Sequence, residues 1–192
     1  MQWLNTIVDE VEVRHPEGEI LVESGVSPSG TYHVGTLREV LTCDAIMLEL
    51  RHRGRQARHI HYVDDLDPFR KIPANVSPEF EKYFGKPYQD IPSPDDSGKS
   101  YADFFLEDFL RAAEKLNMDM VVIRSHEKYR SNFMLPAVEQ ILTEVDKVRQ
   151  VIENVSGRKL EEGWAPIQVM EDGYLKNRRF LSIDKVNKTI TY

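Results

Sequence analysis

The chain has 192 residues, enough for one sizeable hydrophobic core or for one core and the start of a second unit. Hydrophobic residues make up 41% and charged residues 30%, which excludes collagen-like and wholly disordered classes. The net charge of -7 means that any nucleic-acid contact needs a local basic patch, and the single cysteine, Cys43, excludes an intrachain disulfide and favours a reducing compartment, for which we expect the cytoplasm.

The first part of the chain predicts a strand–helix–strand unit. Residues 1–13 carry neither a basic start nor a continuous apolar run, so we expect no signal peptide and no membrane span. Residues 20–22 are an apolar strand candidate that ends in a loop rich in serine, glycine and proline. Apolar residues at helical spacing predict a helix over 34–53, and residues 57–63 predict a second strand. This order is a βαβ unit, whose crossover should be right-handed.

The alternation of helices and strands continues after an irregular segment. Prolines crowd residues 68–94 and predict an irregular excursion with one short helix near 78–84. Apolar spacing then predicts a helix, a strand and a second helix, at 101–116, 120–123 and 136–155. Short strand candidates follow at 164–170, 180–183 and 189–192. We place a domain boundary near Gly157, where the pattern changes.

The string SPSGTYHVGT, residues 27–36, lies between the first strand and the helix that follows it. The free N–H groups and the dipole of a first helical turn favour phosphate, and Gly30 and Gly35 let a ligand approach the backbone. His33 can donate a hydrogen bond to phosphate oxygens and Thr36 adds a hydroxyl, so both are candidates for catalysis of nucleotidyl transfer. The alternative is a simple turn with His33 as a helix cap; the full string in this context favours the phosphate site.

A second string, VDDLDPFRKIP, follows the second strand at the sheet edge that lines the ligand crevice in open α/β folds. It holds three carboxylates within four residues, on Asp64, Asp65 and Asp67. They would repel one another without a nearby cation, such as the ammonium of an amino-acid substrate, although Arg70 and Lys71 balance part of the charge. The alternative is a solvated acidic turn, which the first string makes the weaker interpretation.

Two further patterns have structural interpretations. His59 and His61 alternate on the second strand, but no third ligand is spaced for a metal, so we expect no metal site. A dense basic cluster at residues 51–58 falls at the end of a helix, where positive charge is favoured. We therefore interpret it as structural and not as an RNA footprint.

Together the strings resemble the class I aminoacyl-tRNA synthetases, and among them the archaeal-type lysyl-tRNA synthetases. ESGVSPSGTYHVGTLREV resembles the HIGH signature of the class, and DDLDPFRKIP, KYFGKPYQDIPSP and SYADFF extend the resemblance over most of residues 23–105. The resemblance implies a Rossmann-type catalytic domain over residues 1–157 and the start of a β-rich inserted module over residues 158–192. It also implies that lysine and ATP, accompanied by Mg²⁺, form lysyl-adenylate, from which lysine passes to tRNA(Lys).

The resemblance assigns roles to individual positions. ATP binding falls on Ser29, Gly30, His33, Gly35 and Thr36. Lysine binding falls on Gly25, Ser27 and Asp64, with Asp64 at the α-ammonium. Thr36 stands where the family usually has asparagine, and the stretch after Trp164 lacks the zinc-binding cysteines of many members. The chain also has no KMSKS-type loop and no helical anticodon-binding domain, so we expect a truncated chain with little activity of its own.

The residues leave two other functions open. A different nucleotidyltransferase of the same superfamily would use the same phosphate cradle with a small acid or alcohol as its second substrate. A non-catalytic nucleotide-binding fragment would keep the fold without turnover.

Overall fold

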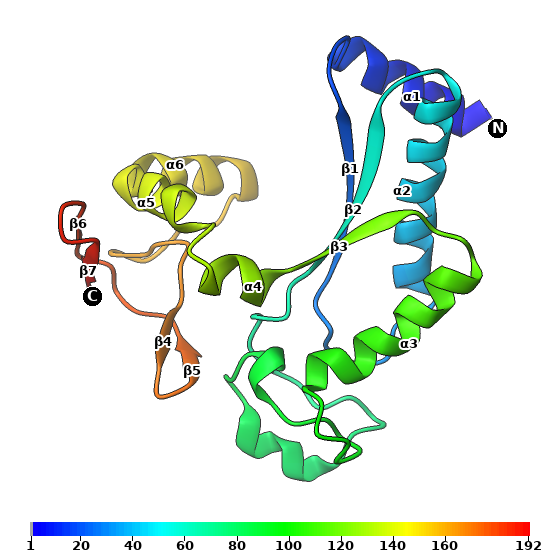
Figure 1. The fold of residues 1–192 in the computed structure, drawn as a ribbon. Coiled ribbons are helices and arrows are strands. Elements are labelled where there is room, and N and C mark those ends of the chain that lie inside the picture. The colour runs from blue at the N-terminus through cyan, green and yellow to red at the C-terminus, as the bar shows by residue number, and fades with distance from the viewer. Residues whose placement is uncertain (1) are drawn as a thin grey trace. The chain divides into compact units, whose positions relative to one another are not determined.

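The computed structural model describes residues 2–192 (Figure 1). The chain forms two compact units, the first ending at Glu127 and the second running from Lys128 to Tyr192. This division comes before the predicted boundary near Gly157, because the helices that precede Gly157 belong to the second unit. The assignment of residues 1–157 to a catalytic domain concerns function and stays a prediction.

A three-stranded parallel sheet organises the first unit. Across the sheet the strands are β1 (Ile20–Val26), β2 (Ala57–Val63) and β3 (Met120–Arg124). The register pairs Val26 with Val63 and Val63 with Arg124, so the three strands end at the same edge. Helix α2 (Val34–His52) connects β1 to β2 and packs against both strands (Figure 1). The predicted βαβ unit and the Rossmann-like α/β fold class are confirmed.

Alternation and helical spacing explain how these elements bury their apolar faces. Every second residue of β2, from Ala57 to Val63, is buried. On the helix, Val40, Met47 and Leu50 are buried while Leu48 is exposed. Helix α1 (Gln2–Arg14), which the sequence did not predict, packs against α2. It completes a core cluster made of Leu4, Val8, Ile20, Met47, Leu50 and Ala57.

The proline-rich excursion between β2 and β3 has a core of its own. It contains two 3₁₀ helices, η1 (Pro78–Tyr83) and η2 (Tyr88–Asp90), the first where a short helix was predicted. Its buried residues are largely aromatic and gather around Phe69, Tyr88, Tyr101 and Phe105. Helix α3 (Tyr101–Lys115) then begins at Ser100, whose side chain accepts a hydrogen bond from the Asp103 N–H at 3.0 Å. Packing of aromatic rings therefore fixes a segment that has little regular secondary structure.

The boundary between the units falls inside helix α4, and the second unit continues with helices and two small hairpins. The elements from β3 onward are α4 (Ser125–Arg130), α5 (Leu135–Thr143), α6 (Val145–Ser156), β4 (Val169–Glu171), β5 (Tyr174–Lys176), β6 (Ser182–Asp184) and β7 (Thr189–Thr191). The single helix predicted over 136–155 is wrong: it is two helices, because Glu144 leaves helical geometry at φ −108° and ψ 27°. The β4–β5 turn uses Asp172 and Gly173, both at positive φ, which suits a tight hairpin.

None of the helices within residues 2–192 is long and apolar enough to cross a membrane.

Candidate functional site

A cavity of about 390 Å³ lies where the loop after β1 enters α2. Its walls come from that loop, from the first turn of α2 and from the segment after β2. Five of the eight predicted site residues line it: Ser27, Ser29, Gly30, His33 and Thr36. The cavity therefore brings the two sequence strings together at the carboxyl edge of the sheet.

The other three predicted residues lie outside the lining. The backbone N–H of Gly25 donates to Glu39 Oε1 at 2.9 Å. Asp64 directly follows β2, and its N–H donates to the Val26 carbonyl at 2.8 Å, so it lies next to Ser27 at the ends of the strands. Gly35 is in the first turn of α2. Gly25, Gly35 and Asp64 are thus neighbours of cavity residues along the chain or across the sheet, but they do not form part of the cavity wall.

The orientation of the His33 ring is fixed by the helix that it caps. His33 has extended backbone geometry, and its Nδ1 accepts a hydrogen bond from the Gly35 N–H at 3.0 Å. In that arrangement Nδ1 carries no proton, so the ring hydrogen lies on Nε2. The exposed ring thus presents an N–H donor at the amino end of α2, whose dipole also favours an anion.

The two glycines of the first string make room for protein groups. A Cβ on Gly35 would lie 2.8 Å from His33 Cε1, so a larger residue would displace the ring. A Cβ on Gly30 would lie 3.1 Å from Pro73 Cγ, which places the proline ring directly against the loop. These glycines thus seat His33 and Pro73, and that they also let a ligand approach the backbone stays a prediction.

Several contacts fasten the segment after β2 to the loop before α2. Phe69 is fully buried in the aromatic cluster. Asn75 Nδ2 donates to Thr31 Oγ1 at 3.1 Å, and the Tyr101 hydroxyl donates to the Ser29 carbonyl at 3.0 Å. The two walls of the cavity are thus held together by residues far apart in sequence.

Two of the three predicted carboxylates lie near the rim of the cavity. Asp67 Oδ2 accepts a hydrogen bond from Ser27 Oγ at 2.5 Å, and Asp67 Oδ1 is 3.9 Å from the Arg70 guanidinium. Burial raises the pKa of Asp64 above its usual value, and the neighbouring negative charge of Asp67 raises it further. A positively charged group placed beside these carboxylates would relieve their repulsion.

The third carboxylate, Asp65, is fully buried and serves the protein itself. It accepts hydrogen bonds from Arg124 Nε at 2.6 Å, Ser125 Oγ at 2.8 Å and the His126 N–H at 2.8 Å, and it lies 2.6 Å from His126 Nδ1. Burial acts to raise the pKa of Asp65, but these hydrogen bonds outweigh it and leave the pKa below its usual value. Asp65 therefore joins the ends of β2 and β3, and the interpretation of all three acids as a ligand-facing group is corrected.

His59 and His61 form a buried polar cluster with Ser24. Ser24 Oγ lies 2.8 Å from His59 Nε2 and 2.8 Å from His61 Nδ1. Burial, with a smaller effect of the neighbouring His59, lowers the pKa of His61 to about 4. Within the part of the chain that the structure describes, no three histidine, cysteine, aspartate or glutamate residues gather in a way that could hold a metal ion.

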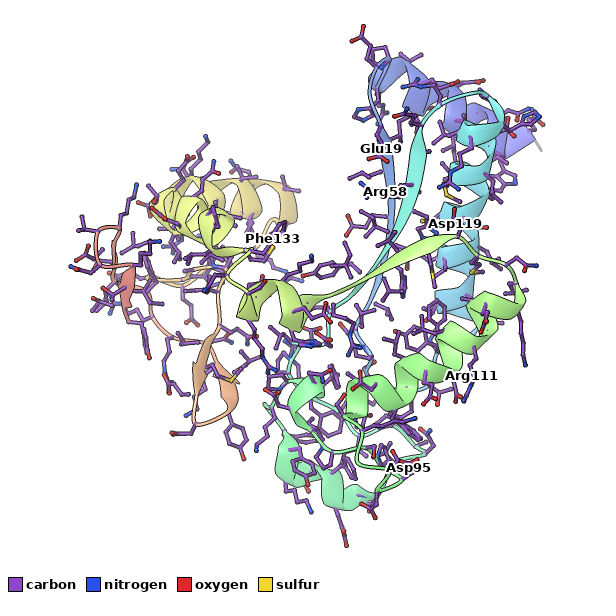
Figure 2. The ribbon with its side chains drawn as sticks, viewed as in Figure 1. Glu19, Arg58, Asp95, Arg111, Asp119 and Phe133 are labelled. Atoms are coloured by element: carbon purple, nitrogen blue, oxygen red, sulfur yellow. The ribbon has the colours of Figure 1, made fainter. Side chains whose placement is uncertain are left out.

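The basic cluster at the end of α2 is engaged in ion pairs. Arg51 Nη1 is 2.5 Å from Asp119 Oδ2, and Arg53 Nε is 2.9 Å from Glu49 Oε1. Arg58 on β2 is 2.9 Å from Glu19, which precedes β1 (Figure 2). These contacts agree with the structural interpretation of the cluster.

The lining also includes residues to which the sequence analysis assigned no role in the site, among them Arg70, Lys71, Asn75 and Tyr88. Arg70 and Lys71 were recognised only as countercharges to the acidic string. Asn75 and Tyr88 gave no signal of a role in the site, since their position depends on the path of the proline-rich excursion. The burial of Phe69 and the contact of Pro73 with Gly30 help to bring that path back to the loop before α2.

Comparisons with known proteins all find similarity to tRNA synthetases. A family model described as "tRNA synthetases class I (K)" matches residues 1–192. One similar protein is the lysine–tRNA ligase of Methanococcus maripaludis, which is 32% identical over 100% of this chain and 36% of that protein. Another is the lysine–tRNA ligase of Thermoplasma acidophilum, which is 34% identical over 86% of this chain and 32% of that protein. The lysine–tRNA ligase of Thermococcus kodakarensis is 32% identical over 96% of this chain and 36% of that protein.

The chain thus spans about a third of the length of these relatives. The family match extends over the cavity, the sheet and the second unit alike. The chain belongs to the family of class I tRNA synthetases (K).

Proposed function

We propose that this chain carries the ATP- and lysine-binding part of a lysine–tRNA ligase. Such an enzyme joins the lysine carboxylate to the α-phosphate of ATP, releases pyrophosphate and then transfers lysine to tRNA(Lys). The observation that carries the proposal is the cavity at the amino end of α2, lined by His33 and Thr36. The lysine–tRNA ligase names of the relatives support the choice of amino acid.

The phosphates of ATP are the ligand that the α2 wall suits best. His33 Nε2–H, the Thr36 hydroxyl and the free N–H groups of the first turn are hydrogen-bond donors. Held in place before the substrate arrives, they can stabilise negative charge as it develops on the phosphates. His33 and Thr36 are therefore the proposed catalytic residues, with Ser29, Gly30 and Gly35 forming the loop and helix turn around them.

Lysine is proposed to bind beside this site, at the ends of β1 and β2. Asp64 is next to Ser27 there, and its carboxylate can accept hydrogen bonds from an α-ammonium group. The exposed backbone of Gly25 lies on β1, two residues before Ser27. An ammonium ion would also reduce the repulsion that raises the pKa of Asp64.

Mg²⁺ is expected to arrive with ATP. Among the described residues that line the cavity, the polar side chains are hydroxyls, one amide, an imidazole and two cations, with no carboxylate among them. Mg²⁺ prefers phosphate and carboxylate oxygens, so the phosphates of the nucleotide fit this ion better than the cavity wall does.

Calorimetric titration of the 192-residue chain tests the proposal. We expect ATP and a non-hydrolysable lysyl-adenylate analogue each to bind, and the analogue to bind more tightly because it occupies both subsites. The same analogue carrying glutamate is the control. Equal binding of the two analogues would reject lysine, and no binding of ATP or of either analogue by the folded chain would reject the whole assignment.

A further inference from the structure

We infer that Arg70 and Lys71 form a second, cationic wall that binds the triphosphate of ATP together with the amino end of α2. This inference rests on the proposed function and adds the residues that would neutralise the substrate. Both side chains line the same cavity as His33 and Thr36, although they come from the segment after β2.

Charge balance is the first argument. A helix amino end is equivalent to about half a positive charge, and the His33 ring, with Nδ1 accepting a hydrogen bond, is neutral. A triphosphate carries several negative charges, so the α2 wall alone leaves most of that charge uncompensated. Arg70 and Lys71 are the two cationic side chains among the described residues of the lining.

The second argument is that these two cations are not neutralised by close ion pairs. Arg51, Arg53 and Arg58 each lie within 3.0 Å of a carboxylate oxygen. Arg70, in contrast, is 3.9 Å from Asp67 and is largely exposed. Within residues 2–192, no carboxylate forms an ion pair with Lys71, which leaves its ammonium group available to an anion in the cavity.

The third argument is that the backbone carrying these cations is anchored on both sides. Phe69 precedes them in the buried aromatic cluster. Pro73 rests against Gly30, and Asn75 is hydrogen bonded to Thr31. The chain therefore presents both cations from a fixed position against the phosphate loop, which lowers the entropy lost on binding.

The two side chains suit different parts of the same task. The planar guanidinium of Arg70 can contact two phosphate oxygens at once, whereas the ammonium of Lys71 is a compact charge on a flexible stem. A nucleoside without phosphates would gain nothing from either group. The inference therefore predicts that substitution of Arg70 or Lys71 weakens the binding of ATP and leaves the binding of adenosine unchanged.

The test compares ATP and adenosine binding to the wild-type chain and to Arg70→Gln, Lys71→Gln and Lys71→Arg. We expect each glutamine variant to bind ATP roughly tenfold or more weakly, as for loss of a charge-assisted hydrogen bond. Adenosine affinity should not change, and Lys71→Arg should keep most of the ATP affinity. Lys115→Gln, at the end of α3 and outside the cavity lining, is the matched control for loss of one charge.

The outcomes separate the inference from the function on which it rests. If the wild type binds ATP but the glutamine variants bind it as the Lys115→Gln control does, the inference is wrong and the proposed function stands. An equal loss of ATP and adenosine affinity would also overturn it, because the effect would then be on the fold of the site. Absence of ATP binding by the folded wild-type chain would reject both.

Discussion

At the scale of single residues, His33 depends on the glycine two positions later. Gly35 donates its N–H to His33 Nδ1, and a Cβ at position 35 would lie only 2.8 Å from the ring. We predict that Gly35→Ala displaces the ring and weakens ATP binding roughly tenfold, the loss of one good donor. Nitrogen-detected NMR of the imidazole should show that Nδ1 is no longer the hydrogen-bonded acceptor.

A double variant provides the control for this prediction. If Gly35 acts through His33, the double variant Gly35→Ala, His33→Ala should bind ATP no more weakly than His33→Ala alone. Fully additive losses would contradict the proposed coupling between the two residues.

Asp65 is predicted to be a stability residue. Asp65→Asn removes the buried charge that faces Arg124 and His126 and leaves the guanidinium without its closest partner. Breaking a buried pair in this way should reduce the free energy of unfolding by about 3 to 5 kcal/mol, measured by urea denaturation. Asp95→Asn, at an exposed residue of the excursion (Figure 2), should change the free energy of unfolding by less than about 0.5 kcal/mol. Similar losses in both variants would contradict this role.

At the scale of elements, helix α2 packs against the core through one face only. Two leucines on opposite sides of the helix, Leu50 and Leu48, test this packing. Leu50 is fully buried in the cluster with α1, whereas Leu48 is 52% exposed. Leu50→Ala should lower the free energy of unfolding by about 2 to 5 kcal/mol through lost burial and a new cavity. The same substitution at Leu48, on the same helix, should cost far less. Equal costs would mean that the helix packs through a different face.

The buried His61 on β2 should make the free energy of unfolding decrease at acidic pH. The pKa of His61 is about 4 in the folded chain, against about 6.5 for an unperturbed histidine. Between these values the unfolded state binds a proton that the folded state does not. The contribution of neutral His61 to the free energy of unfolding is therefore complete above about pH 6.5. It is lost as the pH falls toward 4, and the free energy of unfolding then decreases by up to about 3 kcal/mol.

Urea unfolding at a series of pH values between 7 and 4 measures this effect. We expect His61→Gln to flatten the dependence of the unfolding free energy on pH in that window, whatever its effect on absolute stability. The prediction fails if the wild type and the variant lose stability with the same slope.

The elements also show how far the sequence could predict this molecule. The βαβ unit, the position of α3 and the phosphate loop carry periodic or glycine signals that act over a few neighbouring residues, and these were predictable. The break at Glu144 was not predictable, because no glycine or proline marks it. Helix α1 was not predicted either, because its apolar face is short: only Leu4 and Val8 are buried. The burial of Asp65 was hidden for a similar reason: its partners lie on β3 and α4, and only the folded sheet brings them together.

At the scale of the whole molecule, two compact units share one chain that corresponds to about a third of each related ligase. The proposed ATP site is assembled within the first unit, from β1, α2 and the excursion after β2. The account therefore predicts that nucleotide binding is a property of the first unit. The second unit should bind none of the substrate's phosphates.

Amide NMR of the ¹⁵N-labelled chain, titrated with ATP and Mg²⁺, tests this central claim most directly. The account predicts saturable shift changes for the amides of residues 29–36 and of Arg70 and Lys71, with little change beyond Lys128. Changes confined to other surfaces, or none at ATP concentrations well above the millimolar range, would contradict the claim that the amino end of α2 holds the phosphates.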